Sequence, residues 1–593
     1  MRKILLVSVL FVLILIIAGC NNKNVTISVD EEMSRIKHLI PFEYNADIVL
    51  PAASKGFSVV YIVDGTISED NIIEYDLSTI NKEVFIEFTV SSKDSAVDSN
   101  ILISQTISNQ QYDILFEELV SDISSQIPSY ISSNTSLPLV NNEFIHVDFN
   151  TDCTEIVRNR IVYSAPSETL QCNLNVIGNF KNHYVEEKIP FKMTAIDDLP
   201  KIPTIYITTE DNAEIVTKEY YIPGSVTLVI EGESEYSEIL DAEMKIKLRG
   251  NSTLNMPKKP YKIKFSDEQA LLSDYAEKKW VLLANHVDQT LLRDYLAFSM
   301  SSKIDIGFSP SFTFVDVFIN GVYQGNYLLT DQVEVSVNRV NIEEKVSDVN
   351  TGYLVEYDIG LYREGLENTD ENFFLIDEIP FVIKSPDFED DHYVEEQKEY
   401  IEDYFNIVLD TLKNKEDYSS LIDESTFIDW FIVNEVFKNV DSGYSSVYFH
   451  KDKDGLLKMG PVWDFDISSG VPGYVSEDLR GPVGWWTPRE DKNIFFYYLM
   501  QYPSFQENLK ARWNEVYEDS IIVVLDEIIS VSDEITQSRY NNFELWDIIG
   551  KEEDWYTSPE VYALKTYDEQ LWFLYDYLKI RIEWLNTEIN NFS

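Results

Sequence analysis

The sequence is poor in basic residues and in cysteine. It has 47 Lys and Arg against 102 Asp and Glu, a formal net charge of −55, and only 3 Cys among 593 residues. The shortage of positive charge argues against general nucleic-acid binding, because phosphate backbones are recognised by basic surfaces. The sequence also lacks a Cys-x-x-Cys motif and any Cys/His cluster, which argues against a structural zinc site.

Long apolar runs are scarce as well. The run Ile4–Ile17 follows two basic residues and is shorter than the roughly 20 residues that a membrane-spanning helix needs. It fits a signal peptide over residues 1–19. Cys20, directly after two small residues, resembles the lipidated cysteine of bacterial lipoproteins, and residues 20–24 would form a short tether. We therefore expect an extracytoplasmic protein that is lipid-anchored to the cell membrane; the alternative is an uncleaved N-terminal anchor.

The two other cysteines, Cys153 and Cys172, lie nineteen positions apart. In an oxidising compartment they could form a disulfide. Cys172 also alternates with Leu174 and Val176 along an apolar strand face, which is typical of a buried thiol. Spacing alone leaves both alternatives open.

Apolar residues, in contrast, are abundant. Hydrophobic residues make up 44% of the chain and aromatic residues 13%, so most of the chain can fold around large cores. Alternating apolar residues predict two immunoglobulin-like β-sandwich modules, at residues 25–118 and 140–200, with a Ser/Asn-rich linker at 119–139. From residue 203 to 590 the pattern changes to mixed helix and strand, so the predicted fold class is α+β.

Several elements of the region 203–590 are marked clearly. Apolar residues at helical spacing predict helices over about 290–302, 391–412, 426–437 and 568–592. Asn320-Gly321 between two apolar runs is a strong hairpin signal.

One window departs from the acidic composition. Residues 245–264 contain seven basic residues and no acid. Lys and Arg alternate with apolar residues in two predicted strands, which places the cations on one face of a hairpin whose connection is residues 250–260. A cationic face beside a Gly/Asn/Ser turn suits phosphate oxygens; the alternative is a solvated sheet face paired with acids elsewhere.

A second group of residues follows the helix predicted at 426–437. The helix delivers Asp441 into a polar loop, a hairpin spans about 447–459, and Asp464 and Asp466 come directly after it. Protein kinases present a catalytic Asp and a metal-holding Asp in this order. In that chemistry one carboxylate accepts a hydrogen bond from the acceptor hydroxyl, and another holds Mg²⁺ against the phosphates. The alternative is that these are ordinary surface acids.

Several stretches of the region 203–590 occur in the order of a known family. They are Ile246–Ser252, Pro257–Phe265, Trp280–Asn285 with Asp288 and Leu292-Arg293, Asn320–Leu329, Gly352–Glu356 and Gly460–Asp466. With these motifs the chain resembles the CotH (spore coat protein H-like) kinase family, as a bacterial lipoprotein member.

The resemblance implies an atypical protein-kinase-like, two-lobed domain that uses ATP with Mg²⁺ or Mn²⁺. It implies transfer of the γ-phosphate to secreted, surface or coat proteins, with Asp441 as the catalytic residue and Asp464 and Asp466 as metal ligands. The implied nucleotide-binding residues are Arg249, Asn251, Lys259 and Lys262.

Two other function classes stay open. Many kinases carry an Asn a few residues after the catalytic Asp, whereas this chain has Tyr444-Ser445-Ser446. That difference leaves room for a weak or inactive kinase-like lipoprotein that acts as an adhesin, coat or envelope scaffold. A glycoside hydrolase could combine paired carboxylates with a Trp485-Trp486 sugar platform. Neutral sugars need no basic stripe, however, and two adjacent Trp are more typical of packing in a core or lid.

Overall fold

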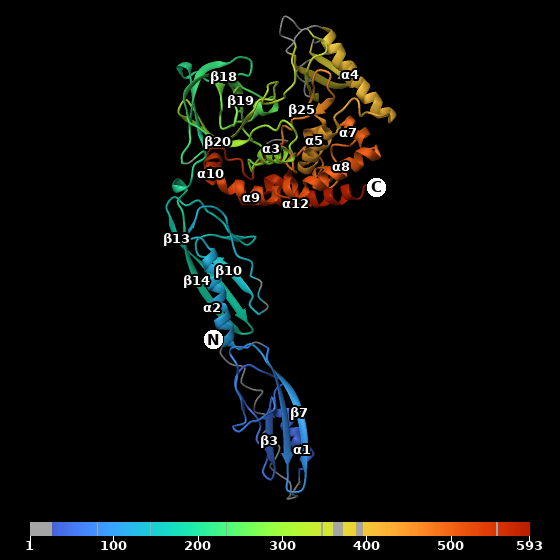
Figure 1. Cartoon of the computed structure of the whole chain (residues 1–593). Helices are drawn as coiled ribbons and strands as arrows, with labels where there is room; N and C mark the ends of the chain where they lie inside the picture. Colours follow the sequence, from blue (N-terminus) through green and yellow to red (C-terminus); the bar gives the residue numbers. More distant parts are fainter. Residues whose placement is uncertain are drawn as a thin grey trace. The chain divides into compact units, whose positions relative to one another are not determined.

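Figure 1 shows the chain as a computed structural model. The described residues are 27–79, 81–140, 142, 144–232, 234–345, 348–359, 372–386, 395–552 and 556–592. The predicted signal peptide at residues 1–19, the lipidation site Cys20 and the tether at 20–24 lie outside them. No helix within these ranges has the length and apolar content that crossing a bilayer requires. The chain divides into two compact units, one with the residues up to Ser164 and Leu170–Met193, the other with Ala165–Thr169 and the residues from Thr194 on.

The first part of the N-terminal unit is a β-sheet with a helix packed on it. Its elements are α1 (Val29–Leu39), β1 (Glu43–Tyr44), β2 (Ile48–Val49), β3 (Ser58–Val63), β4 (Thr66–Ile67), β5 (Ile72–Ile73), β6 (Glu83–Ser91) and β7 (Ala96–Gln105). The main sheet has the order β1-β7-β6-β3-β4, while β2 pairs with β5. Along β6, Val84, Ile86 and Phe88 are buried and alternate with exposed residues, which gives the strand one core-facing side. α1 covers that side by packing on β6 and β7.

The second part of this unit repeats the plan with other strands. Its elements are α2 (Asn109–Gln126), β8 (Tyr130–Ile131), β9 (Thr135–Ser136), β10 (Val147–Thr151), β11 (Ile156–Val157), β12 (Arg160–Ile161), β13 (Leu170–Phe180) and β14 (His183–Met193). The larger sheet has the order β10-β13-β14-β8 and the smaller one β11-β12-β9. α2 packs on β13 and β14.

These sheets confirm β modules ahead of a mixed domain, but residues 119–139 are not a plain linker. The second half of α2 and the short strands β8 and β9 occupy much of this segment. Tyr112, Phe116 and Ile123 are buried along one side of α2, at helical spacing. Polar residues on its exposed side, among them Ser121, Ser124 and Ser125, hid this pattern in the sequence.

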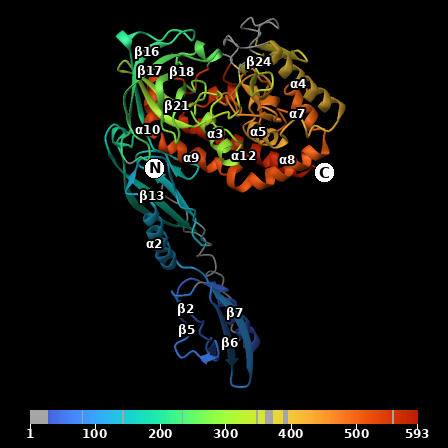
Figure 2. The same ribbon diagram turned by 45° about the horizontal axis from the view of Figure 1, so that its top comes forward.

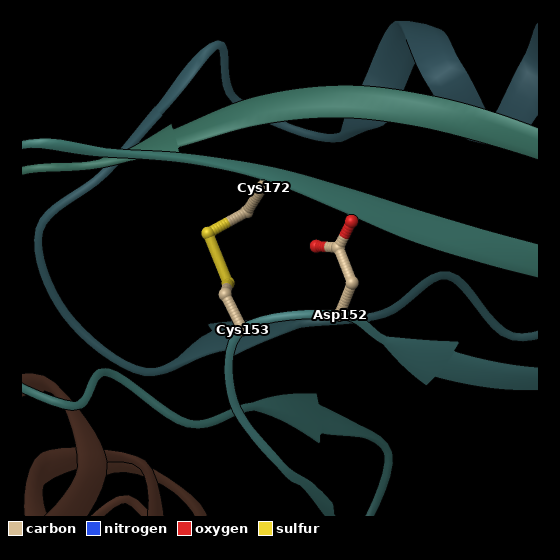
Figure 3. A group of neighbouring side chains, drawn as sticks. All are labelled: Asp152, Cys153 and Cys172. Atoms are coloured by element: carbon tan, nitrogen blue, oxygen red, sulfur yellow. A yellow bond between two sulfur atoms is a disulfide. The ribbon is translucent and has the colours of Figure 1, made fainter.

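The two cysteines of the second part form a disulfide. The Cα atoms of Cys153 and Cys172 are 5.7 Å apart, and Figure 3 shows the bond reaching from β13 to the segment that follows β10. Of the two alternatives that the spacing left open, the structure therefore has the disulfide. Asp152 lies beside it and accepts hydrogen bonds from the backbone and side chain of Asn173.

The C-terminal unit begins with a closed β-barrel. Its strands are β15 (Thr204–Thr209), β16 (Ile222–Val229), β17 (Ile239–Leu248), β18 (Tyr261–Gln269), β19 (Glu277–Leu283), β20 (Thr313–Ile319) and β21 (Val322–Asp331). They follow the order β15-β16-β17-β18-β19-β21-β20, and β15 closes the barrel by pairing in parallel with β20. The side chains of Ile246, Ile263 and Trp280 are fully buried inside. Asn320 and Gly321 both have positive φ values, 50° and 78°, and form the turn between β20 and β21 that the sequence predicts.

The rest of this unit is a second sheet with helices around it. Its elements are α3 (Arg293–Ile304), β22 (Tyr353–Tyr357), β23 (Phe373–Ile376), β24 (Ile379–Ser385), α4 (Glu395–Asn414), α5 (Glu424–Phe437), β25 (Val447–Lys451), β26 (Leu457–Met459), α6 (Glu477–Arg480), α7 (Ile494–Leu499), α8 (Pro503–Val516), α9 (Val524–Glu534), α10 (Thr536–Leu545), α11 (Pro559–Ala563) and α12 (Tyr567–Asn590). The sheet order is β23-β24-β22-β25-β26. α3, α4, α5 and α12 match the predicted helices to within a few residues, apart from residues 391–394, which are not described.

Figures 1 and 2 show the barrel on one side of α3 and the helical part with its sheet on the other. The helical part has its own large apolar core, which is separate from the interior of the barrel. Val281 on β19 is fully buried and belongs to this second core, although its neighbours Trp280 and Leu282 point into the barrel. The outer side of β19 is therefore where barrel and helical part meet.

Candidate active site

A cavity of about 700 Å³ opens where the barrel meets the helical part. It is lined by the turn between β17 and β18, the segment after β19, the first turn of α3, the end of β22 and the segments that follow α5 and β26. The predicted residues Asp441, Asp464, Asp466, Arg249 and Asn251 all belong to this lining. The two sequence groups that lie some two hundred residues apart thus face one cavity.

Asp441 is placed by the end of α5. The helix stops at Lys438, which is left-handed with φ 46°, and the chain then turns through Val440–Gly443. The side chain of Asn439 accepts a hydrogen bond of 3.0 Å from the backbone N–H of Asp441. Because α5 is buried over nearly its whole length, this turn is held rigidly, and it presents the carboxylate of Asp441 to the cavity.

Asp464 is held from two sides. The hydroxyl of Ser446 donates to its carboxylate at 3.0 Å, and the side-chain amide of Asn439 donates to its backbone carbonyl at 3.2 Å. Both Asp464 and Ser446 have positive φ, 67° and 57°, a backbone conformation that residues with a Cβ adopt at an energetic cost. The loops around Asp441 and Asp464 are therefore joined directly to each other.

Asp294 is a further acid of the cavity that fixes the same loop. It lies in the first turn of α3, and its carboxylate accepts a hydrogen bond of 2.7 Å from the backbone N–H of Phe465, between Asp464 and Asp466. Burial, and after it the neighbouring charge of Asp464, raises the pKa of Asp294 to about 7. Asp294 thus positions the backbone that carries the two predicted metal ligands.

Negative charge dominates the cavity. The acids of its lining are Asp294, Glu356, Asp358, Asp441, Asp464 and Asp466, and its Lys and Arg residues are Arg249 and Lys258. Burial raises the pKa of Asp441 well above its usual range, with further contributions from Asp464 and Asp358. Burial also raises the pKa of Asp466, where the next causes are the charges of Asp464 and Asp294. The protein alone leaves these carboxylates poorly compensated.

The two cations of the lining differ in what they contact. Lys258 is buried and donates to the backbone carbonyl of Asn326 and to the side chain of Asn542, and burial lowers its pKa to about 7. Arg249 has its guanidinium carbon 5.5 Å from the ring centroid of Trp463 and favours the charged form of Asp464. Its guanidinium makes no hydrogen bond within the described parts of the chain, so it can offer its donors to a ligand.

The carboxylates fit a divalent cation that shares its coordination with a ligand. Within the described ranges, one group of three His, Cys, Asp or Glu residues has its potential ligand atoms within 4.8 Å of one another: Asp152, Cys153 and Cys172. Both of its sulfurs form the disulfide, so they are not available to a metal ion (Figure 3). Asp464 and Asp466 therefore do not close a metal cage on their own. Mg²⁺ commonly binds one or two carboxylates and takes its remaining oxygens from water and substrate phosphates, which matches a cluster of uncompensated acids beside Arg249.

Two of the predicted nucleotide-binding residues lie outside the cavity. The ammonium of Lys259 donates to the backbone carbonyls of Leu254 and Met256, each at 2.6 Å. Its neighbour Lys258 lines the cavity instead. Lys262 lies on the outer face of β18, opposite Lys247 on β17.

Trp485 and Trp486 do not form a sugar platform. Trp486 is 4% exposed, and its indole N–H donates to the carbonyl of Val440 at 3.1 Å. The ring of Trp485 packs against Trp584, with centroids 5.1 Å apart. Both rings serve as core packing, so the hydrolase alternative loses the feature that favoured it.

Sequence reasoning missed three acids of the cavity, Asp294, Glu356 and Asp358. Each had a signal nearby, because Asp294 directly follows Leu292-Arg293, and Glu356 ends the stretch Gly352–Glu356, two stretches that carried the family resemblance. Acids within or directly beside these stretches could therefore have been predicted as site residues, like Asp464 and Asp466. Asp358 lies two residues beyond the second stretch.

The barrel, the second sheet and the helices around it form a domain of mixed helix and sheet, and its cavity is lined by more acids than bases. Residues 246–585 match the family model described as CotH kinase protein, which is more than half of the chain. The chain therefore belongs to the CotH family. No curated protein matches it.

The solved structures that are similar to part of the chain include cadherin domains and cadherin-like domains. Mouse protocadherin-24 EC1-3 is 10% identical, with 41% of this chain and 95% of that chain covered and a TM-score of 0.17. Cadherin-like domains 1 to 4 of zebrafish RET are 7% identical, with 40% and 68% covered and a TM-score of 0.12. TM-scores this low carry no inference about fold or function.

Proposed function

We propose that the chain is a surface-anchored atypical protein kinase, which transfers the γ-phosphate of ATP to extracytoplasmic or coat proteins. The observation that carries the proposal is the convergence of Asp441, Asp464 and Asp466 with Arg249 on one cavity. Membership of the CotH family supports the same reading. The lipid anchor at Cys20 belongs to the proposal and rests on the N-terminal sequence alone.

In this proposal ATP is a substrate and its phosphates lie beside Arg249. Arginine presents several N–H donors in a plane, which suits phosphate oxygens, and Asn251 in the same turn borders the cavity. Asp464 and Asp466 would hold Mg²⁺ or Mn²⁺, which neutralises phosphate charge when bound. Asn439, Ser446 and the Asp294–Phe465 hydrogen bond keep their loop in place.

Asp441 would accept the proton of the acceptor hydroxyl. The hydroxyl oxygen forms a bond to the γ-phosphorus, the bond from that phosphorus to the bridging oxygen breaks, and ADP leaves. The raised pKa of Asp441 makes its carboxylate a better proton acceptor than an ordinary Asp. Its place at the end of a rigid buried helix suits the orientation that such a group needs.

The test is phosphate transfer from labelled ATP, with Mg²⁺ or Mn²⁺, to a generic Ser-containing acceptor protein. Asp441→Asn should lower the rate on the order of 10²–10⁴-fold, the usual loss for a general base, with unchanged thermal unfolding. Asp410→Asn, an exposed acid on α4, is the matched control and should keep wild-type activity. Wild-type transfer by Asp441→Asn would contradict its catalytic role, and wild-type transfer by Asp464→Asn would contradict the metal role.

A catalytically weak or inactive scaffold is the second candidate. It is favoured by Ser446, which stands near the position where many kinases have a metal-binding Asn. The hydroxyl of Ser446 donates its hydrogen bond to the carboxylate of Asp464. Restoring an amide with Ser446→Asn should raise transfer if the chain is a weak enzyme. A scaffold without activity should show no transfer in either form and should not bind Mg²⁺ with ATP.

A further inference from the structure

Five lysines form a ladder on the outer face of the barrel. They are Lys245 and Lys247 on β17, Lys262 and Lys264 on β18, and Lys279 on β19. Lys245 is directly opposite Lys264, Lys247 is opposite Lys262, and Lys264 is opposite Lys279. Like charges directly opposite each other in a sheet are destabilising. We call these five residues the lysine ladder.

The ladder is poorly neutralised, although acids are abundant in the chain. Glu334 forms an ion pair with Lys279 and is shared with Arg339. Lys245 and Lys247 lie over the ring of Tyr221, with their ammonium nitrogens 5.1 and 4.8 Å from its centroid. Within the described parts of the chain, Lys262 and Lys264 have no ion pair. Acids outnumber bases by 102 to 47, so a shortage of acidic residues in the chain does not explain why these two lysines lack an ion pair.

The ladder leads to the cavity. Lys245, Lys247 and Arg249 follow each other at every second position of the chain, and Arg249 lines the cavity. Side chains two apart in a strand are about 7 Å apart, and neighbouring strands about 4.8 Å. The ladder is therefore roughly 7 by 10 Å, which is more than one phosphate or carboxylate group can cover.

We propose that the lysine ladder binds an acidic segment of the protein acceptor, whose hydroxyl then enters the cavity; this rests on the proposed function. An extended peptide places alternate side chains on one side about 7 Å apart, which is the spacing along Lys245–Lys247 and along Lys262–Lys264. Several carboxylates or phosphorylated side chains can thus meet several ammonium groups. A nucleotide bound at Arg249 would leave Lys245 and Lys264, at the far end of the ladder, for the acceptor.

The environment of Lys262 agrees with an anionic ligand. Burial lowers the pKa of Lys262 to about 7, and the charges of Lys279 and Lys247 act in the same direction. A carboxylate or phosphate placed beside it would favour the charged ammonium. The negative charges of a bound acidic segment would thus offset the repulsion among the five lysines.

The experiment measures binding of a dye-labelled hexaglutamate peptide to the full chain in nonionic detergent, by fluorescence anisotropy, without nucleotide. The double variant Lys245→Gln/Lys264→Gln should bind about tenfold more weakly, since each exposed ion pair adds modestly. The matched control is Lys413→Gln/Lys458→Gln, which removes the same charge from lysines that pair with Asp377 and Asp423. The control should bind like the wild type. Equal affinities of the ladder variant and the wild type, or an equal loss in the control, overturn the proposal.

A second probe separates an acceptor site from a phosphate site. Inorganic triphosphate should bind the ladder variant as tightly as the wild type, because the ladder variant keeps Arg249. Loss of triphosphate affinity, whether alone or equal to the loss for hexaglutamate, overturns the assignment to a protein acceptor. If hexaglutamate binds through the ladder but no phosphate is transferred, the kinase proposal fails, whereas the lysine ladder stands as a docking surface for acidic segments. If phosphate is transferred but hexaglutamate does not bind, only the docking proposal fails.

Discussion

Buried acids in the C-terminal unit are of two kinds. Glu435 is 1% exposed and forms an ion pair with the equally buried Arg581, and it also accepts backbone N–H groups of Trp486 and Thr487. Asp441 in the cavity faces other carboxylates instead, and burial, followed by the charges of Asp464 and Asp358, raises its pKa. Paired charge holds the helical part together, whereas unpaired charge marks the place where a ligand supplies the partner.

Two lysines of this unit differ in their hydrogen bonds. Lys438 is buried at the end of α5, and its ammonium donates to the carbonyls of Gly481 and Val483 at 2.7 and 2.6 Å. Lys262 in the ladder faces Lys247 and Lys279. The paired groups should therefore matter for stability, and the unpaired groups for binding.

The largest expected effect on stability comes from breaking a paired site. Arg581→Met leaves Glu435 buried without its cation, and we expect the free energy of unfolding to fall by about 3–5 kcal/mol. Denaturant unfolding followed by tryptophan fluorescence measures it. The double variant Glu435→Gln/Arg581→Met removes both charges and should lose clearly less. Equal losses in the single and double variants would show that the two side chains stabilise the fold through packing alone. The proposed difference between paired and unpaired buried charges would then not hold.

The next effect should come from supplying the missing partner to an unpaired site. Mg²⁺ at about 100 times its dissociation constant should raise the free energy of unfolding by about 2–3 kcal/mol, and a chelator should reverse the gain. Asp464→Asn should abolish this gain in stability. The readout is unfolding, so it does not depend on catalytic activity. Asp410→Asn on the exposed side of α4 should respond like the wild type. An unchanged response of Asp464→Asn would place the metal elsewhere.

The order of elements allowed the central acids to be predicted. A helix, a polar turn and a hairpin precede Asp464, and each leaves a local pattern in the sequence, so Asp441, Asp464 and Asp466 could be assigned to one site. The alternation around Arg249 likewise predicted strands with a cationic face, which β17 and β18 have. These features depend on neighbours along the chain.

The roles that residues take through distant contacts could not be predicted. Asp294 enters the site through a hydrogen bond to Phe465, 171 positions away. Lys258 lines the cavity in place of Lys259 because contacts with Asn326 and Asn542 fix its side chain. The helix α2 was hidden because its few buried residues are separated by polar ones.

The smallest effect should come from removing one unpaired cation. In the folded chain the pKa of Lys262 is about 7, while in the unfolded chain it is near 10.4. Below pH 7 both states carry the proton and the folded state bears the full cost of the buried charge. As pH rises from 7 toward 10.4 the folded state loses the proton first, so this cost shrinks.

Lys262→Met should therefore stabilise the fold by about 1–2 kcal/mol at pH 6, and the gain should fade as the pH approaches 10. Denaturant unfolding at several pH values measures it, and Lys458→Met, a lysine near Asp423, is the control without such a gain. The same Lys262→Met substitution should weaken hexaglutamate binding. A variant that gains stability and loses binding would show that the lysines repel one another in the free protein and that this cost serves ligand binding. A loss of stability would instead place Lys262 among the paired, structural charges.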